Sequence, residues 1–228
     1  MSKGWTSHSS DWETWGRAWR GICSARGIAS HSTTELERRP RRWFRGPKLG
    51  RPPSWIRLRG AVANAEAVFT MLADDAAVED VVFGPDGIAE ALAAGAIHIS
   101  SSTISTGLAR RSAEEHRRRD QNYVSAPVFG PPEAAESKRL MVVAGGSNAA
   151  VGRCRPLFDA IGRQTFLAGP EPWRANAAKL CGSFMIASRL ESFGAANALL
   201  RKAGVDPHVF LDVMKRCSDL RCTRTTAA

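Results

Sequence analysis

Lys179 is the residue whose type and setting most readily suggest chemistry in this chain. It lies in residues 178–183 (AKLCGS), where its neighbours are small or apolar. An ammonium group can neutralise negative charge that develops on an oxygen atom, and burial adjusts its pKa. A lysine on a helix is solvated in most proteins, however, so its role depends on the elements around it.

Two further segments could contribute groups to a site. Ser102 and Thr103 lie in a polar loop at residues 101–105, where hydroxyl groups ordinarily cap the following helix. Gly130 begins a Gly-Pro-Pro sequence, which ordinarily forms a turn. No CxxC motif or His/Cys cluster in the sequence suggests a metal site.

The element that must position Lys179 is a long helix expected at residues 172–204. Pro172 suits a first helical turn, and Gly204 is a natural stop. Apolar residues recur between them at roughly helical spacing, at Leu180, Phe184, Ala187, Leu190 and Ala195. We therefore expect an amphipathic helix, long enough to connect two lobes, with Lys179 near its start.

The chain from residue 61 onward has the alternating pattern of an α/β protein. Strands are expected at residues 67–72, 96–100, 123–126, 140–144 and 165–168. Helices are expected at residues 74–82, 88–94, 107–118 and 149–161, and another opens at Asp206-Pro207. Such alternation predicts a mostly parallel sheet whose sites lie at the carboxyl ends of its strands.

The net charge of +10 is distributed unevenly over the 228 residues. Residues 1–60 carry a net +9, residues 61–214 a net −2 and residues 215–228 a net +3. Six of the seven Trp residues also precede residue 60. The central segment is therefore an ordinary globular sequence between two basic ends. The ends admit two interpretations, a disordered tail or an arm that binds nucleic acid through Trp43 and Trp55.

The totals also bound the cellular setting. No run of about 18 apolar residues occurs, so no membrane span is expected. The first ten residues lack the apolar core of a signal peptide, and the five cysteines are scattered and odd in number. These features favour a reducing, cytoplasmic location with free thiols.

Four segments in this order resemble the β-hydroxyacid dehydrogenases, the 3-hydroxyisobutyrate dehydrogenase-like family that is related to 6-phosphogluconate dehydrogenase. They are VFTML at residues 68–72, SSSTIST at 100–106, SAPVFGPPEAAESKRLMVVAGG at 125–146 and AKLCGS at 178–183. The second is similar to the D-x-S-T-x-x-P loop, the third to the D-A-P-V-S-G-G segment and the fourth to K-L-x-x-N. The resemblance covers roughly residues 61–214.

This resemblance implies an oxidoreductase that passes hydride between NAD or NADP and a small β-hydroxyacid or semialdehyde. It places Lys179 as the general acid/base at the hydroxyl or carbonyl oxygen. The implied substrate-binding residues are Val128, Phe129, Gly130 and Ser183, and the implied cofactor-binding residues are Met71, Leu72, Ser102 and Thr103. The family also implies a homo-oligomer, with neither a membrane nor a nucleic acid as a partner.

Four positions depart from the family pattern. Phe129 replaces the serine of the substrate segment, and Ser183 replaces the asparagine that follows the lysine. Ser100 and Thr106 replace the aspartate and the proline of the cofactor loop. The first change is expected to alter the substrate more than the activity, and Ser183 is shorter than the residue it replaces.

The G-x-G-x-x-G turn that would hold the pyrophosphate does not occur in residues 1–60. A codon argument accounts for this. If each new codon starts at the third base of an existing one, residues 10–16 (SDWETWG) can read Gly-Leu-Gly-Asn-Met-Gly. The leucine and the last two glycines of that fingerprint are forced. We therefore hypothesise that residues 5–59 and 215–228 are translated out of frame, and we expect negligible NAD(P)H binding by this chain.

The resulting fold prediction is an incomplete Rossmann-like NAD(P)-binding domain followed by a truncated all-helical domain. Residues 1–60 would be an aberrant basic, disordered segment and residues 61–170 the partial cofactor domain. Residues 171–214 would hold the interdomain helix and the start of the helical domain, and residues 215–228 an aberrant tail. The alternatives are a basic-tailed nucleic-acid-binding protein and a non-catalytic oligomerisation fragment that uses the long helix.

Overall fold

The computed structural model describes residues 29–32, 59–60, 62–131 and 133–219. These residues belong to two compact units, and the boundary between the units follows Leu180. Each unit is described by itself. Within the described ranges, none of the helices combines the length and the apolar character needed to cross a membrane.

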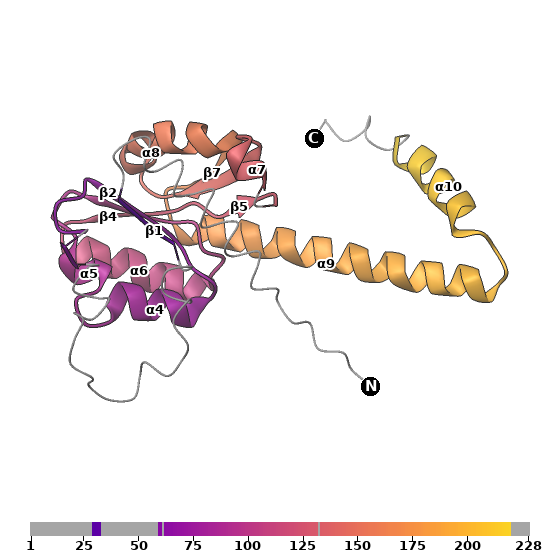
Figure 1. The fold of residues 1–228 in the computed structure, drawn as a ribbon, viewed down its shortest axis with the longest axis horizontal. Coiled ribbons are helices and arrows are strands. Elements are labelled where there is room, and N and C mark those ends of the chain that lie inside the picture. The colour runs from indigo at the N-terminus through magenta and orange to yellow at the C-terminus, as the bar shows by residue number, and fades with distance from the viewer. Residues whose placement is uncertain (1–28, 33–58, 61, 132, 220–228) are drawn as a thin grey trace, which may run out of the picture. The chain divides into compact units, whose positions relative to one another are not determined.

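A mixed β-sheet forms the centre of the first unit (Figure 1). Its strands within the described residues are β1 (Ala29–Ser32), β2 (Ala67–Met71), β3 (Ile97–Ser100), β4 (Asn122–Ser125), β5 (Val128–Phe129), β6 (Leu140–Gly145) and β7 (Gly162–Gly169). They lie in the order β1-β2-β3-β4-β6-β5, and β7 also pairs with β6. Strands β1 to β4 are mutually parallel, β6 runs antiparallel to β4 and β5, and β7 is parallel to β6.

Helices cover both faces of this sheet (Figure 1). One face carries α4 (Asp75–Phe83), α5 (Ile88–Ala91) and α6 (Thr106–Arg118), and the other carries α7 (Glu133–Glu136) and α8 (Asn148–Ile161). Three of these helices begin at side chains that accept a hydrogen bond from the first turn, namely Asp74, Ser105 and Ser147. Apolar residues form a separate buried cluster on each face, which fixes the sheet between two helical layers.

Strand β5 continues the direction of β4 after a short break at Ala126 and Pro127. Ser125 pairs with Gly145, and Val128 then pairs with Val142, so both strands run along the same partner. Pro127 has no N–H to donate, and its carbonyl instead accepts from the Val143 N–H at 2.9 Å. The chain is thereby carried past the carboxyl ends of the parallel strands.

The long helix α9 (Trp173–Lys202) begins in the first unit and extends into the second, which also contains α10 (Pro207–Asp219). The side chain of Asp206 accepts from the His208 N–H at 3.0 Å, as the expected cap should. The long helix is present close to its expected bounds. The apolar residues that recur along it are exposed among the described residues: Phe184 is 70% and Leu190 66% accessible.

The other predicted elements compare closely with the structure. Every strand and helix expected between residues 67 and 161 is present within a few residues of its predicted bounds. The parallel prediction is confirmed for β1 to β4, whereas β6 reverses. Strand β1, in a segment without strand periodicity, was not predicted, and neither were β5 and α7. Trp43 and Trp55 lie outside the described residues.

Candidate functional site

The ammonium of Lys179 is held beside the end of β5. Its Nζ donates a hydrogen bond to the Val128 carbonyl oxygen at 2.7 Å and lies 4.1 Å from the centroid of the Phe129 ring. The side chain is half-buried, and this burial lowers the pKa of Lys179 because a charged group loses solvation. The structure therefore brings the predicted catalytic lysine together with two of the predicted substrate-binding residues.

Gly130 follows these two residues in a conformation that other residues rarely adopt. Its φ is +135°, and a Cβ atom built on it would lie 2.8 Å from the Leu140 Cδ2 atom. Leu140 is fully buried at the start of β6, so it has little room to retreat. The expected turn at residues 130–132 is thus constrained by packing against β6, although Pro132 lies outside the described residues.

The start of α9 packs closely on the end of β6. A Cβ atom at Gly145 would lie 2.8 Å from the Pro172 carbonyl oxygen and 3.2 Å from the Ala175 Cβ. The absence of a side chain at Gly145 therefore lets the helix approach the strand. Because Lys179 is one turn beyond Ala175, this contact fixes the height of the ammonium above the sheet.

The predicted cofactor residues lie at the carboxyl ends of β2 and β3. The Leu72 N–H donates to the buried Ser102 Oγ at 2.8 Å, which joins the two strand ends. The neighbouring Ser101 donates from its Oγ to the Ala126 carbonyl at 2.6 Å. Met71 is half-buried, and Thr103 is exposed on the loop. Strand ends of this kind are where dinucleotide-binding sheets hold their ligands.

The default interpretation of Ser102 and Thr103 as helix caps is wrong. The cap of α6 is Ser105, whose Oγ accepts from the Leu108 N–H at 3.2 Å. Its own N–H donates to Asp75 Oδ1 at 2.9 Å, which ties the loop to α4. The buried Ser102 hydroxyl instead accepts the hydrogen bond from the Leu72 N–H.

Ser183 is a half-buried residue of α9 that lies beyond the unit boundary. It lies four positions after Lys179 on the same helix, which places the two one turn apart. Its contact with a substrate stays a prediction.

Asn176 is a residue of the same region that the sequence did not single out. It is 1% exposed, one turn before Lys179, and neither its Oδ1 nor its Nδ2 has a hydrogen-bond partner in the part of the chain that the structure describes. The sequence did offer a signal, because Asn176 is a lone polar residue among the alanines at positions 175, 177 and 178, where the helix begins.

A second unforeseen group is a buried polar chain between the sheet and α6. His98 Nε2 lies 2.9 Å from Thr70 Oγ1, and His98 Nδ1 lies 2.9 Å from His116 Nε2. His116 Nδ1 in turn lies 2.6 Å from Gln121 Oε1. Burial lowers the pKa of both imidazoles, because a charged ring would lose its hydration.

Tyr123 borders this chain, with its ring stacked on His116 at 5.4 Å between centroids. Its hydroxyl is buried beside those of Ser100, Ser112 and Ser125, and these serine hydroxyls lower the pKa of Tyr123 against the larger effect of burial. Burial raises the pKa of Tyr123, which keeps the phenol neutral. The group is a structural element of the core and lies outside the set of predicted site residues.

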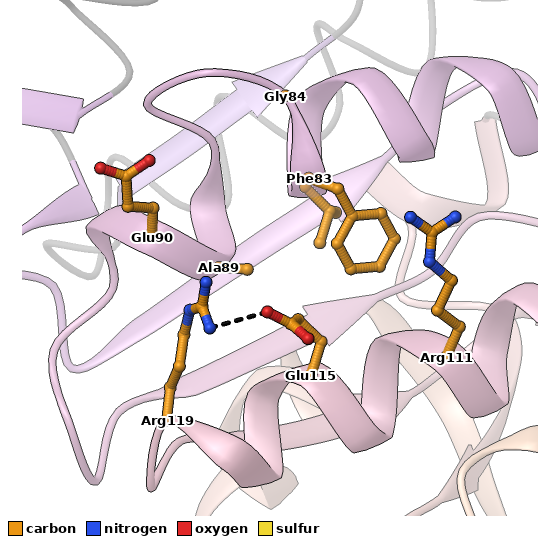
Figure 2. A pocket seen from close by; sticks show the side chains of 8 residues that line it. Phe83, Gly84, Ala89, Glu90, Arg111, Glu115 and Arg119 are labelled. Carbon is orange, nitrogen blue, oxygen red and sulfur yellow. Dashed lines mark ion pairs between the residues drawn. The ribbon is translucent and has the colours of Figure 1, made fainter.

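A hollow of about 260 Å³ lies on the face of the sheet that α4, α5 and α6 cover, among these three helices. Figure 2 shows that Arg119 and Glu115, one turn apart at the end of α6, point toward each other at the hollow, and the pair measures 2.7 Å. The second guanidinium that lines it, Arg111, pairs with Glu79 at 2.7 Å. Both guanidinium groups that line the hollow are therefore paired with a carboxylate. None of the predicted site residues lines the hollow.

The described residues contain no group of three or more His, Cys, Asp or Glu side chains that could hold a metal ion. The groups that the structure places together are one positioned ammonium beside β5 and two strand ends joined by Ser102. Such an ammonium can give a proton to an oxygen atom or take one from it.

Comparisons with known proteins identify the family of this domain. Residues 56–169 match the family model described as the NAD binding domain of 6-phosphogluconate dehydrogenase. The chain is 39% identical over 155 residues to an uncharacterized oxidoreductase, YfjR, of Bacillus subtilis, and this match covers 68% of the chain and 54% of YfjR. It is 32% identical over 155 residues to the 3-hydroxyisobutyrate dehydrogenase of Pseudomonas aeruginosa, covering 68% of the chain and 52% of that protein.

A solved structure gives the same result for the fold. The 3-hydroxyisobutyrate dehydrogenase of Mycobacterium tuberculosis, determined with L-serine, superposes with a TM-score of 0.64 at 26% identity. The superposition covers 68% of this chain and 52% of that one. The chain thus spans about half the length of the curated relatives it matches.

Proposed function

This chain belongs to the β-hydroxyacid dehydrogenases that share the NAD-binding domain of 6-phosphogluconate dehydrogenase, and from that membership we propose its function. The function is hydride transfer between NAD or NADP and a small β-hydroxyacid or the corresponding semialdehyde. The observation that supports it best is the position of Lys179, whose Nζ is held at the Val128 carbonyl. The family match over residues 56–169 favours this function over a nucleic-acid-binding protein or an oligomerisation fragment.

The proposed roles follow from the geometry of the sheet edge. Lys179 gives a proton to the carbonyl oxygen during reduction and takes it back during oxidation. Val128, Phe129 and Gly130 form one wall beside the ammonium, and Ser183 lies one helical turn further along. The nicotinamide, when bound, supplies or accepts the hydride.

The described residues fit the nicotinamide end of the cofactor. Met71 and Leu72 end a parallel strand, and the Ser102 hydroxyl fixes the adjoining loop, so a flat ring could rest on these strand ends. Thr103 is exposed on the same loop and free of the core. We further propose that the protein works in the cytoplasm as a homo-oligomer, on a small-molecule substrate.

The sequence lacks the glycine turn that this function requires for binding the pyrophosphate of the cofactor. We propose that residues 5–59 are read out of frame, because residues 10–16 can encode the glycine turn in the shifted frame. The chain as written would then hold NAD(P)H far more weakly than the chain with the frame restored. The nucleotide sequence around codons 4–60 tests this directly, and stop codons or no glycine turn in the shifted frame would refute it.

A binding experiment with two polypeptides tests both proposals. NADPH and NADH fluorescence is titrated with the chain as written and with a frame-restored chain. We expect binding by the restored chain alone. Micromolar affinity of the chain as written would overturn the reading-frame proposal without affecting the assignment of function.

Turnover of the restored chain tests the role of Lys179. Oxidation of 3-hydroxyisobutyrate and L-serine is measured for the restored chain and for its Lys179→Met variant. Loss of the proton donor is expected to lower kcat by roughly 10²- to 10⁴-fold while cofactor binding is retained. An unchanged kcat would exclude Lys179 as the acid/base.

A further inference from the structure

Two different groups hold the Lys179 ammonium in place. The Val128 carbonyl oxygen accepts one N–H at 2.7 Å, and the face of the Phe129 ring lies 4.1 Å from the nitrogen. Both groups belong to β5, whose backbone is fixed by the pairing of Val128 with Val142 and of Phe129 with Met141. The ring is therefore carried by a strand of the sheet and not by a free loop.

Charged side chains do not account for the position of this ammonium. Neither Glu171, which precedes α9, nor Glu133 on α7 forms an ion pair with Lys179 in the described part of the chain. Burial is the influence that acts on its pKa, and burial favours the neutral amine. An aromatic face acts in the opposite direction, because its negative quadrupole attracts a cation and is indifferent to an amine.

The geometry also determines which N–H donors of the ammonium remain available to a substrate. A lysine ammonium has three N–H donors. One is taken by the Val128 carbonyl, and the side of the nitrogen that faces the Phe129 ring is closed to other acceptors. A donor therefore remains on the open side, where an oxygen atom of a substrate could accept it.

We propose that Phe129 is a positioning residue, whose ring and the Val128 carbonyl together keep Lys179 protonated and directed at the substrate oxygen. This inference rests on the proposed role of Lys179 and adds how the site is prepared for carbonyl reduction. In that direction the carbonyl carbon receives a hydride from a reduced nicotinamide, and the carbonyl π pair forms an O–H bond with the Lys179 proton. The products are the alcohol, the neutral amine and the oxidised nicotinamide.

The substitution that separates the effect of the ring's quadrupole from that of its bulk is Phe129→Leu, because leucine fills similar space without an aromatic face. Phe129→Tyr is the matched control, since it keeps the face. The protein is labelled with ¹³C- and ¹⁵N-lysine and titrated by NMR, and the Lys179 signal is identified by its loss in Lys179→Arg. No cofactor or substrate is needed, so the result is independent of the proposed dehydrogenase activity.

The expected result is an acid dissociation constant of Lys179 that rises at least about threefold in Phe129→Leu and is unchanged in Phe129→Tyr. If the leucine variant does not fold, Phe129→Met lacks the aromatic face in the same way and replaces it. An unchanged constant in the variant without the ring would overturn the proposal. Equal shifts in the leucine and tyrosine variants would also overturn it, because they would show an effect of packing alone.

The two proposals can fail separately. A restored chain that never turns over would refute the dehydrogenase assignment, while the titration would still report whether the ring holds the ammonium. Conversely, active enzyme with an unshifted Lys179 in Phe129→Leu would keep the function and exclude the positioning role.

Discussion

The imidazoles of His98 and His116 are hydrogen-bonded to each other, with Nδ1 of the first 2.9 Å from Nε2 of the second. The neighbours of this pair determine where its protons reside. Gln121 uses its Nε2 to donate to the Ala89 and Leu92 carbonyls, so its Oε1 must accept from His116 Nδ1. His116 Nε2 is then bare and accepts from His98 Nδ1, and His98 Nε2 accepts from Thr70.

This directional chain predicts a loss of stability in mild acid. Both imidazoles are neutral when folded, and burial lowers both pKa values, so the unfolded chain binds protons first as pH falls below about 6.5. The free energy of unfolding should therefore fall by about 2 kcal/mol between pH 7.5 and pH 5.5. Urea unfolding at the two pH values measures it.

The exposed His208 supplies the control for this measurement. His208→Gln should leave the pH dependence intact, because its side chain is outside the buried chain. A stability that does not change between pH 7.5 and pH 5.5 would show that His98 and His116 accept protons freely in the folded state.

Gly130→Ala should destabilise the protein by about 1–3 kcal/mol. The φ of +135° disfavours any side chain, and the added Cβ would approach Leu140 Cδ2 to 2.8 Å. Gly152→Ala is the matched control, because that helical glycine has open space around it and alanine favours helices by about 1 kcal/mol. Opposite shifts of the thermal midpoint are expected, and equal behaviour of the two variants would contradict the strained turn.

Asn176→Leu is expected to raise the free energy of unfolding, by about 1 kcal/mol. Its buried amide makes no hydrogen bond with the described residues, so its removal costs no bond and relieves a desolvation penalty. Gln121→Leu provides the contrast, since that amide bonds to His116 and two carbonyls, and the variant should lose about 2 kcal/mol. A clear loss of stability in Asn176→Leu would reveal a partner such as an ordered water.

Cys154 should resist alkylation in the native protein. Burial raises the pKa of its thiol to about 12, so almost none of it is thiolate near neutral pH. Cys181 and Cys217 are exposed and should react with iodoacetamide first. Peptide mass spectrometry over a time course measures the order, and early modification of Cys154 would show that the core around α8 opens readily.

The order of the strands and helices was predictable because local signals determine it. Asp74 and Ser147 are caps that mark the starts of α4 and α8, β2 is a short, mostly apolar run, and β3 is a short run in which isoleucine alternates with polar residues. Strand β5 could not be foreseen, since two residues have no periodicity and their pairing with β6 is what defines them. Ser105 could not be identified as the helix cap either, because SSSTIST contains several hydroxyl groups. Which of them caps α6 depends on where that helix begins.

The candidate site was predictable in part for a similar reason. The resemblance located Lys179 and Val128 separately, and their contact across 51 residues appears only in the fold. The apolar spacing along α9 predicted a face but could not say what covers it, and in this chain Leu190 is exposed. His98 lies between two isoleucines in a buried strand, which indicated that its side chain could be buried. Its contact with His116 could not be predicted, because 18 positions separate the two residues in the sequence.

The run from Ala126 to Arg139 connects β4 to β6, and within the described residues it joins the sheet through the two residues of β5. It is fastened at one end by the Ala126 N–H, which donates to the Ser100 carbonyl at 2.7 Å, and at the other by Leu140 in β6. Because both ends are fastened, the connection can change between them while the parallel strands β1 to β4 stay in place. The proposed substrate residues Val128, Phe129 and Gly130 all lie in this connection, so a change of substrate preference would leave the parallel strands undisturbed.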